Sequence, residues 1–226
     1  MSVLLTGRVN QYTDESVASS GRWRRGRRSR RGTDEALTRL NGGSYMTVRF
    51  VTGNEGKVAE ARDYLEGIDT VEQVEYDYAE LQSDSLEEIV TRGAEEAYAE
   101  LGSEGAVLVD DTGLFVEALD GFPGPYSAYV EDTLGIERVW RLASEEESRR
   151  ARFRTVLAYA DEERTETFEG AVAGTLVAPR GEDGFGYDPI FEYNGRTFAE
   201  MDTEEKNAIS HRGRALEAFA EWYGGR

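Results

Sequence analysis

A short apolar run that ends on two adjacent carboxylates constrains this chain more than any other stretch. Ala106–Val109 has the length and the β-branched content of a strand that is buried on both faces, and Asp110 and Asp111 follow it directly. Strands of this kind belong to open α/β sheets, in which ligands bind beyond the carboxyl ends. Because neighbouring residues of an extended chain point to opposite faces, we expect the two carboxylates to have different tasks, one toward a ligand and one holding the turn. Thr112 and Gly113 are expected to form that turn.

Three other interpretations apply to this stretch. Asp110, Asp111 and Thr112 can form an Asx-type turn with no further role, which the stretch alone leaves open. The hydrophobic-Asp-Thr-Gly pattern also occurs in aspartic proteases, but their site needs the paired lobes of an all-β chain, whereas this sequence alternates strands and helices. A phosphoaspartate phosphatase needs Asp-x-Asp after its strand, and here the carboxylates are contiguous. We therefore set both enzyme classes aside.

Composition limits the kind of protein this can be. With 226 residues, 39% of them hydrophobic, the chain can bury one substantial core. It has no apolar run long enough to span a bilayer and no signal-peptide core, so we expect a cytoplasmic protein without a membrane partner. The absence of cysteine excludes disulfides and thiolate metal sites.

Charge divides the chain into two parts. Residues 1–45 hold nine arginines against four acidic residues, net +5, so the total of −19 leaves −24 for residues 46–226. The Arg-rich part lacks hydrophobic periodicity and is expected to be a disordered extension, or sequence upstream of a true start at Met46; a nucleic-acid-binding arm is the alternative. The acidic body, which favours arginine over lysine, is typical of proteins adapted to high salt and argues against nucleic acid as a partner.

Lysine and histidine are scarce, which makes their positions informative. Lys57 and Lys206 are the only lysines of the chain, and His211 is its only histidine. In a chain that uses arginine for ordinary surface cations, a retained lysine indicates that a compact point charge is needed. Chance placement is the alternative, and the surroundings of each residue decide between the two.

The first lysine lies at the end of a tight loop. Thr47–Thr52 is predicted as a strand, and an apolar stripe at helical spacing begins at Val58. A glycine-containing loop with a lysine at a helix start offers N–H groups and a cation to an anion, and phosphate is the natural ligand. The loop lacks the Ser or Thr that follows the lysine in a Walker A motif, so a plain connector is the alternative. The candidate phosphate-binding residues are Thr52, Gly53, Asn54, Glu55, Gly56 and Lys57.

Two later segments carry further candidates. In GFGYDP, residues 184–189, glycines leave an aromatic ring accessible for stacking on a base, and Asp188 can accept hydrogen bonds; an aromatic packed on the core is the alternative. In KNAISHR, residues 206–212, Ser210 is predicted to cap the terminal helix, with Lys206, His211 and Arg212 near its positive end. The alternative is that Ser210 caps the helix and that the charged side chains beside it are merely solvated. Both lysines and the histidine then lie in loops beside helix starts, which favours a polyphosphate ligand.

The remaining patterns predict a mixed sheet. Val71–Tyr76 is predicted as a strand, Ser85 as a helix cap, and Val139 as part of a helical apolar stripe. Arg152–Ala160 and Thr167–Val177 are predicted as the two long strands of a hairpin. An antiparallel hairpin added to parallel strand–helix units gives a mixed α/β sheet.

Four motifs in register resemble those of the inosine triphosphate pyrophosphatase family, whose members remove ITP, dITP and XTP. They are TGNEGK (52–57), VDDTGLFVEALDGFPGPYS (109–127), GFGYDPIF (184–191) and TFAEMDTEEKNAISHR (197–212). The resemblance runs from Met46 to about Tyr223 and implies that residues 46–226 form one pyrophosphatase domain. It implies an elongated α/β fold with a central mixed β-sheet flanked by helices, a homodimer, and one Mg²⁺ ion per subunit.

The resemblance also implies roles for individual residues. Asp111 would be the catalytic proton acceptor and would hold the metal together with Glu80, a residue that its own neighbourhood predicts as a solvated loop carboxylate. Many members have Ser at the position of Thr112, which keeps the hydroxyl, and Arg at the position of Tyr129, whose role is left open. The implied substrate-binding residues are Thr52, Gly53, Asn54, Glu55, Gly56, Lys57, Thr112, Phe185, Gly186, Tyr187, Asp188, Lys206, His211 and Arg212.

The expected activity is Mg²⁺-dependent hydrolysis of a non-canonical purine nucleoside triphosphate. Cleavage between the α and β phosphates would give a monophosphate and pyrophosphate and keep the base out of nucleic acid precursor pools. A non-catalytic purine nucleotide sensor that uses the same loops is the alternative. The adjacent carboxylates Asp110 and Asp111 weigh against it, because binding alone does not need them.

Overall fold

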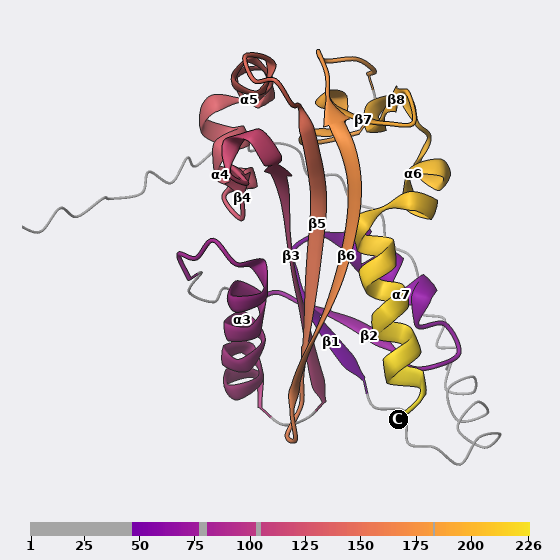
Figure 1. Ribbon diagram of the computed structural model, residues 1–226. Coiled ribbons are helices and arrows are strands. Elements are labelled where there is room, and N and C mark those ends of the chain that lie inside the picture. Colours follow the sequence, from indigo (N-terminus) through magenta and orange to yellow (C-terminus); the bar gives the residue numbers. More distant parts are fainter. Residues whose placement is uncertain (1–46, 77–80, 103–104, 183) are drawn as a thin grey trace, which may run out of the picture. The chain divides into compact units, whose positions relative to one another are not determined.

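The structure is a computed structural model that describes residues 47–76, 81–102, 105–182 and 184–226. Its strands are β1 (Val48–Val51), β2 (Val71–Val74), β3 (Ala106–Val116), β4 (Pro123–Gly124), β5 (Arg150–Ala160), β6 (Thr165–Leu176), β7 (Phe191–Tyr193) and β8 (Arg196–Thr197). They form a sheet of eight strands in the order β2-β1-β3-β5-β6-β7-β8, with β4 paired to β3 (Figure 1). The predicted mixed α/β sheet is confirmed. Residues 1–45 lie outside the described residues, so the division at Met46 stays a prediction.

The parallel part of the sheet ends just before the two carboxylates. Strand β1 runs parallel to β2 and to β3, and Val51 is the last residue of β1, paired with Val74 and with Val109. Asp110 therefore follows the carboxyl edge of the parallel part, as the apolar run predicted.

Strand β3 continues past this edge, so the turn predicted at Thr112 and Gly113 is wrong. Its antiparallel pairing with β5 extends from Val107 opposite Ala160 to Val116 opposite Ala151. This ladder keeps the polar residues extended, because the backbone groups on the side that faces β5 pair with that strand. A side chain at Gly113 would lie 2.4 Å from the carbonyl oxygen of Gly124, where β4 pairs with β3.

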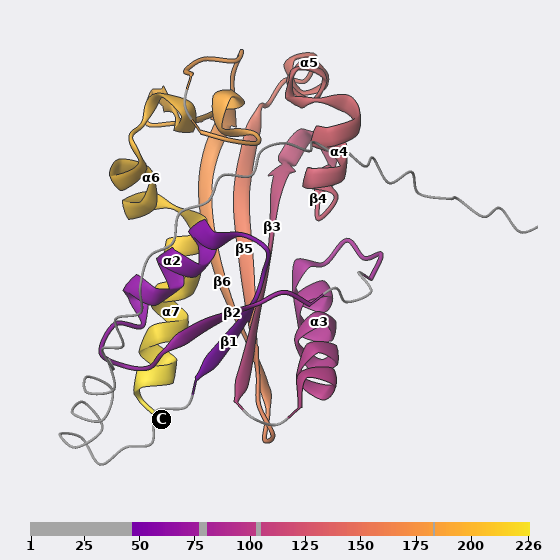
Figure 2. The same ribbon diagram turned by 180° about the vertical axis from the view of Figure 1, so that it is seen from behind.

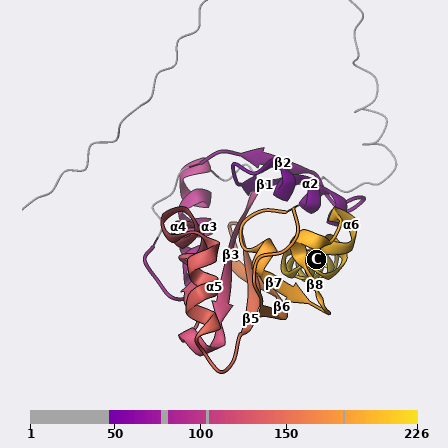
Figure 3. The same cartoon turned by 90° about the horizontal axis from the view of Figure 1, so that it is seen from above.

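Helices cover both faces of the sheet. They are α2 (Glu55–Tyr64), α3 (Leu86–Leu101), α4 (Ser127–Leu134), α5 (Ile136–Ser144), α6 (Thr203–Ile209) and α7 (His211–Gly224), with the 3-10 turns η1 (Glu117–Leu119), η2 (Asp188–Ile190) and η3 (Phe198–Glu200). Helix α3 covers one face, and α2 and α7 cover the other (Figures 2 and 3). The sequence patterns had not indicated α4. Within the described ranges, every helix is too short or too polar to cross a membrane.

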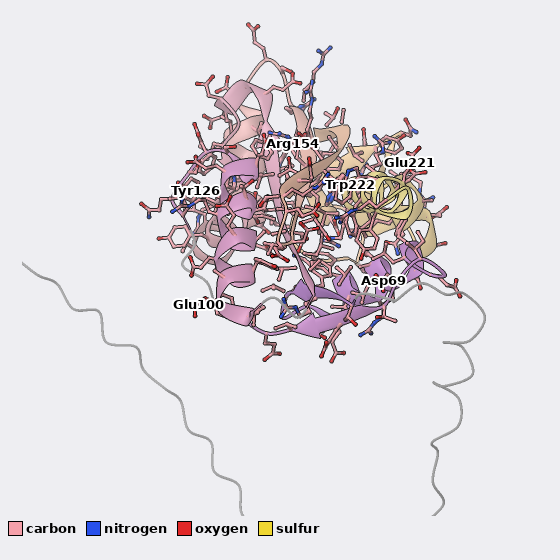
Figure 4. All side chains as sticks on the ribbon, turned by 90° about the horizontal axis from the view of Figure 1, so that it is seen from below. Asp69, Glu100, Tyr126, Arg154, Glu221 and Trp222 are labelled. Carbon is pink, nitrogen blue, oxygen red and sulfur yellow. The ribbon has the colours of Figure 1, made fainter. Side chains whose placement is uncertain are left out.

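Alternate residues of the central strands enter different cores, as strand geometry requires. Phe50 and Leu108 pack with α2 and α7, whereas Val107 and Val109 pack with α3. On α7, Trp222 lies on the side toward the sheet, next to Phe168 at 5.2 Å between ring centroids, while Glu221 is exposed (Figure 4).

A third apolar cluster lies at the far end of the long strands. It joins Leu114 and Val116 of β3 to α4, α5 and β7. Between this cluster and the other two, β3 carries the polar residues Asp110 to Thr112. The fold thereby places polar groups in the middle of a strand whose two ends are fixed by apolar packing.

Candidate active site

One cavity collects most of the predicted ligand residues. Its volume is about 660 Å³, and elements α2, β3, α4, α6 and α7 contribute to its wall. The predicted residues in its lining are Lys57, Asp111, Thr112, Phe185, Gly186, Tyr187, Asp188, Lys206, His211 and Arg212. Motifs that are far apart in the sequence therefore meet at one place.

Asp110 lies behind the cavity wall and joins two cations. Its Oδ1 accepts a hydrogen bond from Lys57 Nζ at 2.9 Å, and its Oδ2 lies 3.5 Å from Arg212 Nε. The side chain of Asp110 is only 1% exposed, and a carboxylate this far from water is stable only beside positive charge. Arg212 Nη1 extends the network to Glu60 Oε2 on α2, at 3.3 Å. Asp110 thus positions Lys57 and Arg212 and does not hold a turn.

Asp111 has the different position that strand alternation predicts. It lines the cavity, whereas Asp110 is turned to Lys57 and Arg212. The backbone N–H of Thr112 donates to Asp111 Oδ1 at 2.8 Å, which orients the carboxylate at the wall. A carboxylate at the surface of a cavity can accept a proton or bind a cation, so both predicted roles of Asp111 remain chemically open to it.

A chain of hydrogen bonds connects β3 to the terminal helix. Thr112 Oγ1 lies 2.7 Å from Thr155 Oγ1 on β5, and Thr155 Oγ1 lies 2.6 Å from His211 Nδ1. Helix α7 can approach this closely because a side chain at Gly170 on β6 would lie 1.9 Å from the carbonyl oxygen of His211. The predicted cap is present, since Ser210 Oγ accepts from the N–H of Gly213 at 2.9 Å.

His211 is buried at the start of α7 and is uncharged at pH 7. Its ring stacks on Phe153 with 5.0 Å between centroids. Burial, followed by the positive charges of Arg212, Lys206 and Lys57, lowers the pKa of His211 to about 3. The histidine therefore serves the cavity as a neutral hydrogen-bonding group and not as one of its cations.

The glycine-flanked aromatic segment presents one ring and buries the other. Phe185 is 66% exposed beside the cavity, while Tyr187 is buried and donates its hydroxyl to the carbonyl oxygen of Ser127 at 2.8 Å. Burial raises the pKa of Tyr187 above its ordinary value, which keeps the hydroxyl a donor. Stacking on a base is therefore possible for Phe185, and packing on the core applies to Tyr187.

Asp188 holds this segment to the second lysine. Its Oδ2 accepts from the N–H of Phe185 at 2.9 Å and from Lys206 Nζ at 2.5 Å. Lys206 Nζ also lies 4.3 Å from the centroid of the Phe185 ring, within the range of a cation–π contact. The carboxylate expected to meet a base is thus engaged with the residues around it.

In the phosphate-loop candidate, an asparagine occupies the helix start. Asn54 caps α2, and its Oδ1 accepts from the N–H groups of Gly56 at 2.9 Å and Lys57 at 3.3 Å. Of the six residues Thr52–Lys57, Lys57 lines the cavity. A phosphate that used these two N–H groups would have to replace the amide oxygen of Asn54, so the role of this loop stays a prediction.

Lys206 lies on a helix, and its predicted position in a loop is wrong. Asp202 caps α6 and forms a capping box with Glu205, which makes a short helix of this polar segment.

Tyr129 on α4 is 69% exposed and does not line the cavity. Glu80, the predicted second metal ligand, lies outside the described residues.

The sequence profile of the Ham1 family matches residues 48–222 of this chain. The chain belongs to the Ham1 family. Among its relatives, the dITP/XTP pyrophosphatase of Methanopyrus kandleri is 54% identical over 184 residues, which cover 79% of this chain and 96% of that protein. The inosine triphosphate pyrophosphatase of Pyricularia oryzae is 41% identical over 186 residues, which cover 80% and 95%. The resemblance drawn from the four motifs is confirmed.

Solved structures of Ham1 proteins have the same fold. The Ham1 protein of Staphylococcus aureus superposes with a TM-score of 0.72 at 30% identity, covering 79% of this chain and 98% of that chain. The HAM1 protein of Coxiella burnetii has a TM-score of 0.71 at 29% identity, covering 80% and 100%.

The motifs did not indicate two residues of this Ham1 site, Thr155 behind the cavity wall and Glu131 in the cavity lining. The sequence does contain a signal for Thr155. Its hydroxyl lies on the strand face that also carries Phe153 and Leu157, so its burial could have been predicted. Glu131 lines the cavity from α4, which had no sequence signal. Burial, followed by the charges of the neighbouring Asp132 and of Asp188, raises the pKa of Glu131.

The donor set of the Ham1 cavity fits Mg²⁺ only together with a ligand. Across the described ranges, no three His, Asp or Glu side chains gather as a metal site. Mg²⁺ is usually held by one or two carboxylates and completes its octahedron with water and substrate phosphates. The cavity-lining carboxylate of Asp111 therefore fits an ion that binds together with a triphosphate.

Proposed function

We propose that this chain is a nucleoside-triphosphate diphosphatase that hydrolyses ITP, dITP and XTP to the monophosphate and pyrophosphate. The observation that carries the proposal is the shared cavity, which is lined by the carboxylate of Asp111, the cations Lys57 and Arg212, and the exposed ring of Phe185. The names of the relatives from Methanopyrus kandleri and Pyricularia oryzae support it, because the aligned regions cover 96% and 95% of those proteins.

In the reaction, Asp111 accepts a proton from the water that attacks the α phosphorus. Lys57, which Asp110 positions, attracts the phosphates and stabilises the charge that develops on the departing pyrophosphate. Local cations matter because residues 46–226 carry a net charge of −24. At an effective dielectric constant of about 20, one opposite-charge pair at contact contributes roughly 4 kcal/mol.

The proposed cofactor is Mg²⁺, one ion per subunit, held by Asp111 with Glu80 as the second predicted ligand. When bound, the ion would offset phosphate charge and lower the pKa of a bound water. Calorimetric titration of the full chain with MgCl₂ and a non-hydrolysable ITP analogue tests this assignment. Binding of Mg²⁺ should be lost in Asp111→Asn and retained in Glu117→Gln, a matched change on η1 that does not line the cavity.

Selection of the base needs stacking and a hydrogen-bond donor. Phe185 offers a face for stacking, and Arg212 and His211 are the candidate donors for the O6 atom of a 6-oxopurine. Adenine has an amino group at this position, so the donor would lose its partner. An unpaired buried donor costs about 1–3 kcal/mol, which favours ITP over ATP.

We further propose a homodimer, a cytoplasmic location and adaptation to high salt. The net charge of −24 over residues 46–226 supports the last of these, since salt screens the self-repulsion of such a surface. Light scattering tests the dimer, and activity measured against KCl concentration tests the salt adaptation.

The decisive assay measures pyrophosphate release from ITP, XTP, dITP, GTP and ATP. We expect release from the first three and a loss of about a thousandfold or more in kcat for Asp111→Asn, at the upper part of the range for general-base catalysis. The variant should keep its fold, because Asn preserves the shape of the side chain. Orthophosphate as the first product would contradict the proposal, and tight ITP binding without release would indicate a sensor.

A further inference from the structure

Thr155 is a fully buried polar residue behind the cavity wall. It is 0% exposed, and its Oγ1 lies 2.7 Å from Thr112 Oγ1 and 2.6 Å from His211 Nδ1. The residue lies on β5 directly opposite Thr112 in the ladder. Since Thr112 and His211 both line the cavity and Thr155 does not, Thr155 connects two ligand-facing groups from behind.

The number of hydrogens limits what this chain of three groups can offer. Each threonine hydroxyl carries one hydrogen, and a neutral imidazole carries one more. Two of these three hydrogens are used in the bonds Thr112–Thr155 and Thr155–His211, so one remains. It lies either on the Thr112 hydroxyl or on Nε2 of His211, because a Thr155 hydroxyl that accepted both bonds would leave its own hydrogen buried without a partner.

The charges around His211 select between these two arrangements. Nδ1 is turned to Thr155, so Nε2 is on the other edge of the ring, toward the cavity that Lys57, Lys206 and Arg212 line. The lining also contains the carboxylates of Glu60, Asp111, Glu131, Asp188 and Asp202, but the charges that act on the pKa of His211, besides burial, are those of the three cations, which lower it. Positive charge favours a lone pair at that edge and disfavours an N–H group. The ring is therefore expected to carry its hydrogen on Nδ1.

We propose that Thr155 is a positioning residue that accepts Nδ1–H of His211 and donates to Thr112. In this arrangement Thr112 presents a hydroxyl donor to the cavity, and Nε2 of His211 presents an acceptor. Thr155 acts through these two neighbours and does not itself touch the ligand. One buried hydroxyl thus decides the hydrogen-bonding character of two groups on the cavity wall.

The arrangement deepens the proposed function, on which this step rests. A donor at Thr112 complements phosphate or sugar oxygens of a nucleotide. An acceptor at Nε2 complements a hydrogen such as the one on N1 of a 6-oxopurine, which adenine lacks. Of the two candidate donors to O6, Arg212 is then the one that remains, because His211 has its hydrogen bound to Thr155.

The position of the hydrogen can be measured directly, because His211 is the only histidine of the chain. The full chain labelled with ¹⁵N-histidine gives ring signals from this residue alone. Long-range ¹H–¹⁵N correlation at pH 7, without any ligand, distinguishes the Nδ1–H from the Nε2–H tautomer. We expect Nδ1–H in the wild type, and Nε2–H there would overturn the proposal.

Two substitutions test whether Thr155 is the cause. In Thr155→Val the buried Nδ1–H loses its acceptor, so the ring should change to Nε2–H, while Thr155→Ser should keep Nδ1–H. In Thr112→Val the hydroxyl of Thr155 loses its acceptor and turns to Nδ1, so the ring should again change to Nε2–H. This second variant answers the question if Thr155→Val does not fold. Retention of Nδ1–H in the folded valine variants would overturn the proposal.

Kinetics supply a separate readout with ITP as the probe. The tautomer of His211 affects the binding of ITP and not the chemical step. Thr155→Val should therefore raise KM about tenfold and change kcat by less than about threefold, and Thr155→Ser should restore KM. Equal losses in kcat and kcat/KM would contradict a positioning role. If the wild type does not hydrolyse ITP, the proposed function fails, and the ligand-free NMR result still decides the role of Thr155.

Discussion

The two lysines of this chain form the same kind of ion pair in different surroundings. Lys57 Nζ lies 2.9 Å from Asp110, and Lys206 Nζ lies 2.5 Å from Asp188. Asp110 belongs to the central strand β3 and faces a second cation, whereas Asp188 belongs to the short turn η2 and also accepts from a backbone N–H. The first pair is anchored in the sheet, and the second is anchored in a loop.

This difference indicates that the two ends of the cavity respond to a ligand in different ways. If a phosphate draws Lys57 away, Asp110 remains beside Arg212, and the network through β3 persists. If a ligand draws Lys206 away, the ammonium leaves both Asp188 and the ring of Phe185. We infer that the Lys57 end is preorganised for charge, and that the Lys206 end adjusts to the base.

Removing each aspartate gives the largest expected difference between the pairs. Asp110→Asn should lower the free energy of unfolding by about 3–5 kcal/mol, because two cations, each at most 21% exposed, lose their carboxylate. Asp188→Asn should cost about 1–3 kcal/mol, since one cation and one N–H group are affected. Urea denaturation measures both changes.

A surface ion pair provides the control for this experiment. Glu169→Gln breaks the pair with Arg154, whose two side chains are 33% and 46% exposed, and should cost no more than about 1 kcal/mol. Equal losses for Asp110→Asn and Asp188→Asn would remove the distinction between an anchored and a loop-borne pair.

Removing each lysine should separate catalysis from binding. Lys57→Met should lower kcat for ITP by about 10²–10³, the usual effect of deleting one group that stabilises transition-state charge. Lys206→Met should act mainly on KM, because its ammonium lies against the base-stacking candidate Phe185. Arg141→Met, on a side chain that is 73% exposed on α5, is the control and should leave both parameters unchanged. A kcat loss of similar size for both lysine variants would contradict the assignment.

The aromatic ring beside Lys206 gives a smaller effect that is confined to binding. Phe185→Ala should raise KM for ITP by roughly tenfold, since stacking of one base contributes about 1–3 kcal/mol. Stability should hardly change, because the ring is 66% exposed. Tyr129→Ala removes a ring of similar exposure, 69%, outside the cavity, and should leave KM as it is. Steady-state kinetics of both variants decide whether stacking occurs at Phe185.

The pH dependence of stability concerns both lysines, because their positive charges act on His211. The folded chain holds the pKa of this ring at about 3, below its ordinary value of 6.5, so the unfolded chain binds more protons between these values. The contribution is fully present above pH 6.5 and is lost as the pH falls toward 3, by at most about 1.4 kcal/mol per pH unit. Urea denaturation across this range gives the free energy of unfolding against pH, and its slope should be weaker in His211→Gln than in the wild type. Equal slopes would refute the assignment.

Local patterns predicted what local interactions determine. The strand before Asp110, the cap at Ser210 and the exposed ring of Phe185 each depend on residues close to them in the chain. The turn at Thr112 and Gly113 was wrong because strand β5, about forty residues later, holds these residues extended through its ladder. Helix α6 was missed because its capping residues lie within a polar segment that the loop interpretation also explained.

The sequence by itself determined the family, the mixed sheet, and which scarce cations and carboxylates were worth following, because these depend on residue type, spacing and period along the chain. Only the tertiary structure decided that Asp110 serves Lys57 and Arg212, and that Thr155 joins Thr112 to His211. These pairings connect elements that chain order does not relate. Their partners are set by strand register and by the packing of α7 against β6, which follow from the burial of the whole core.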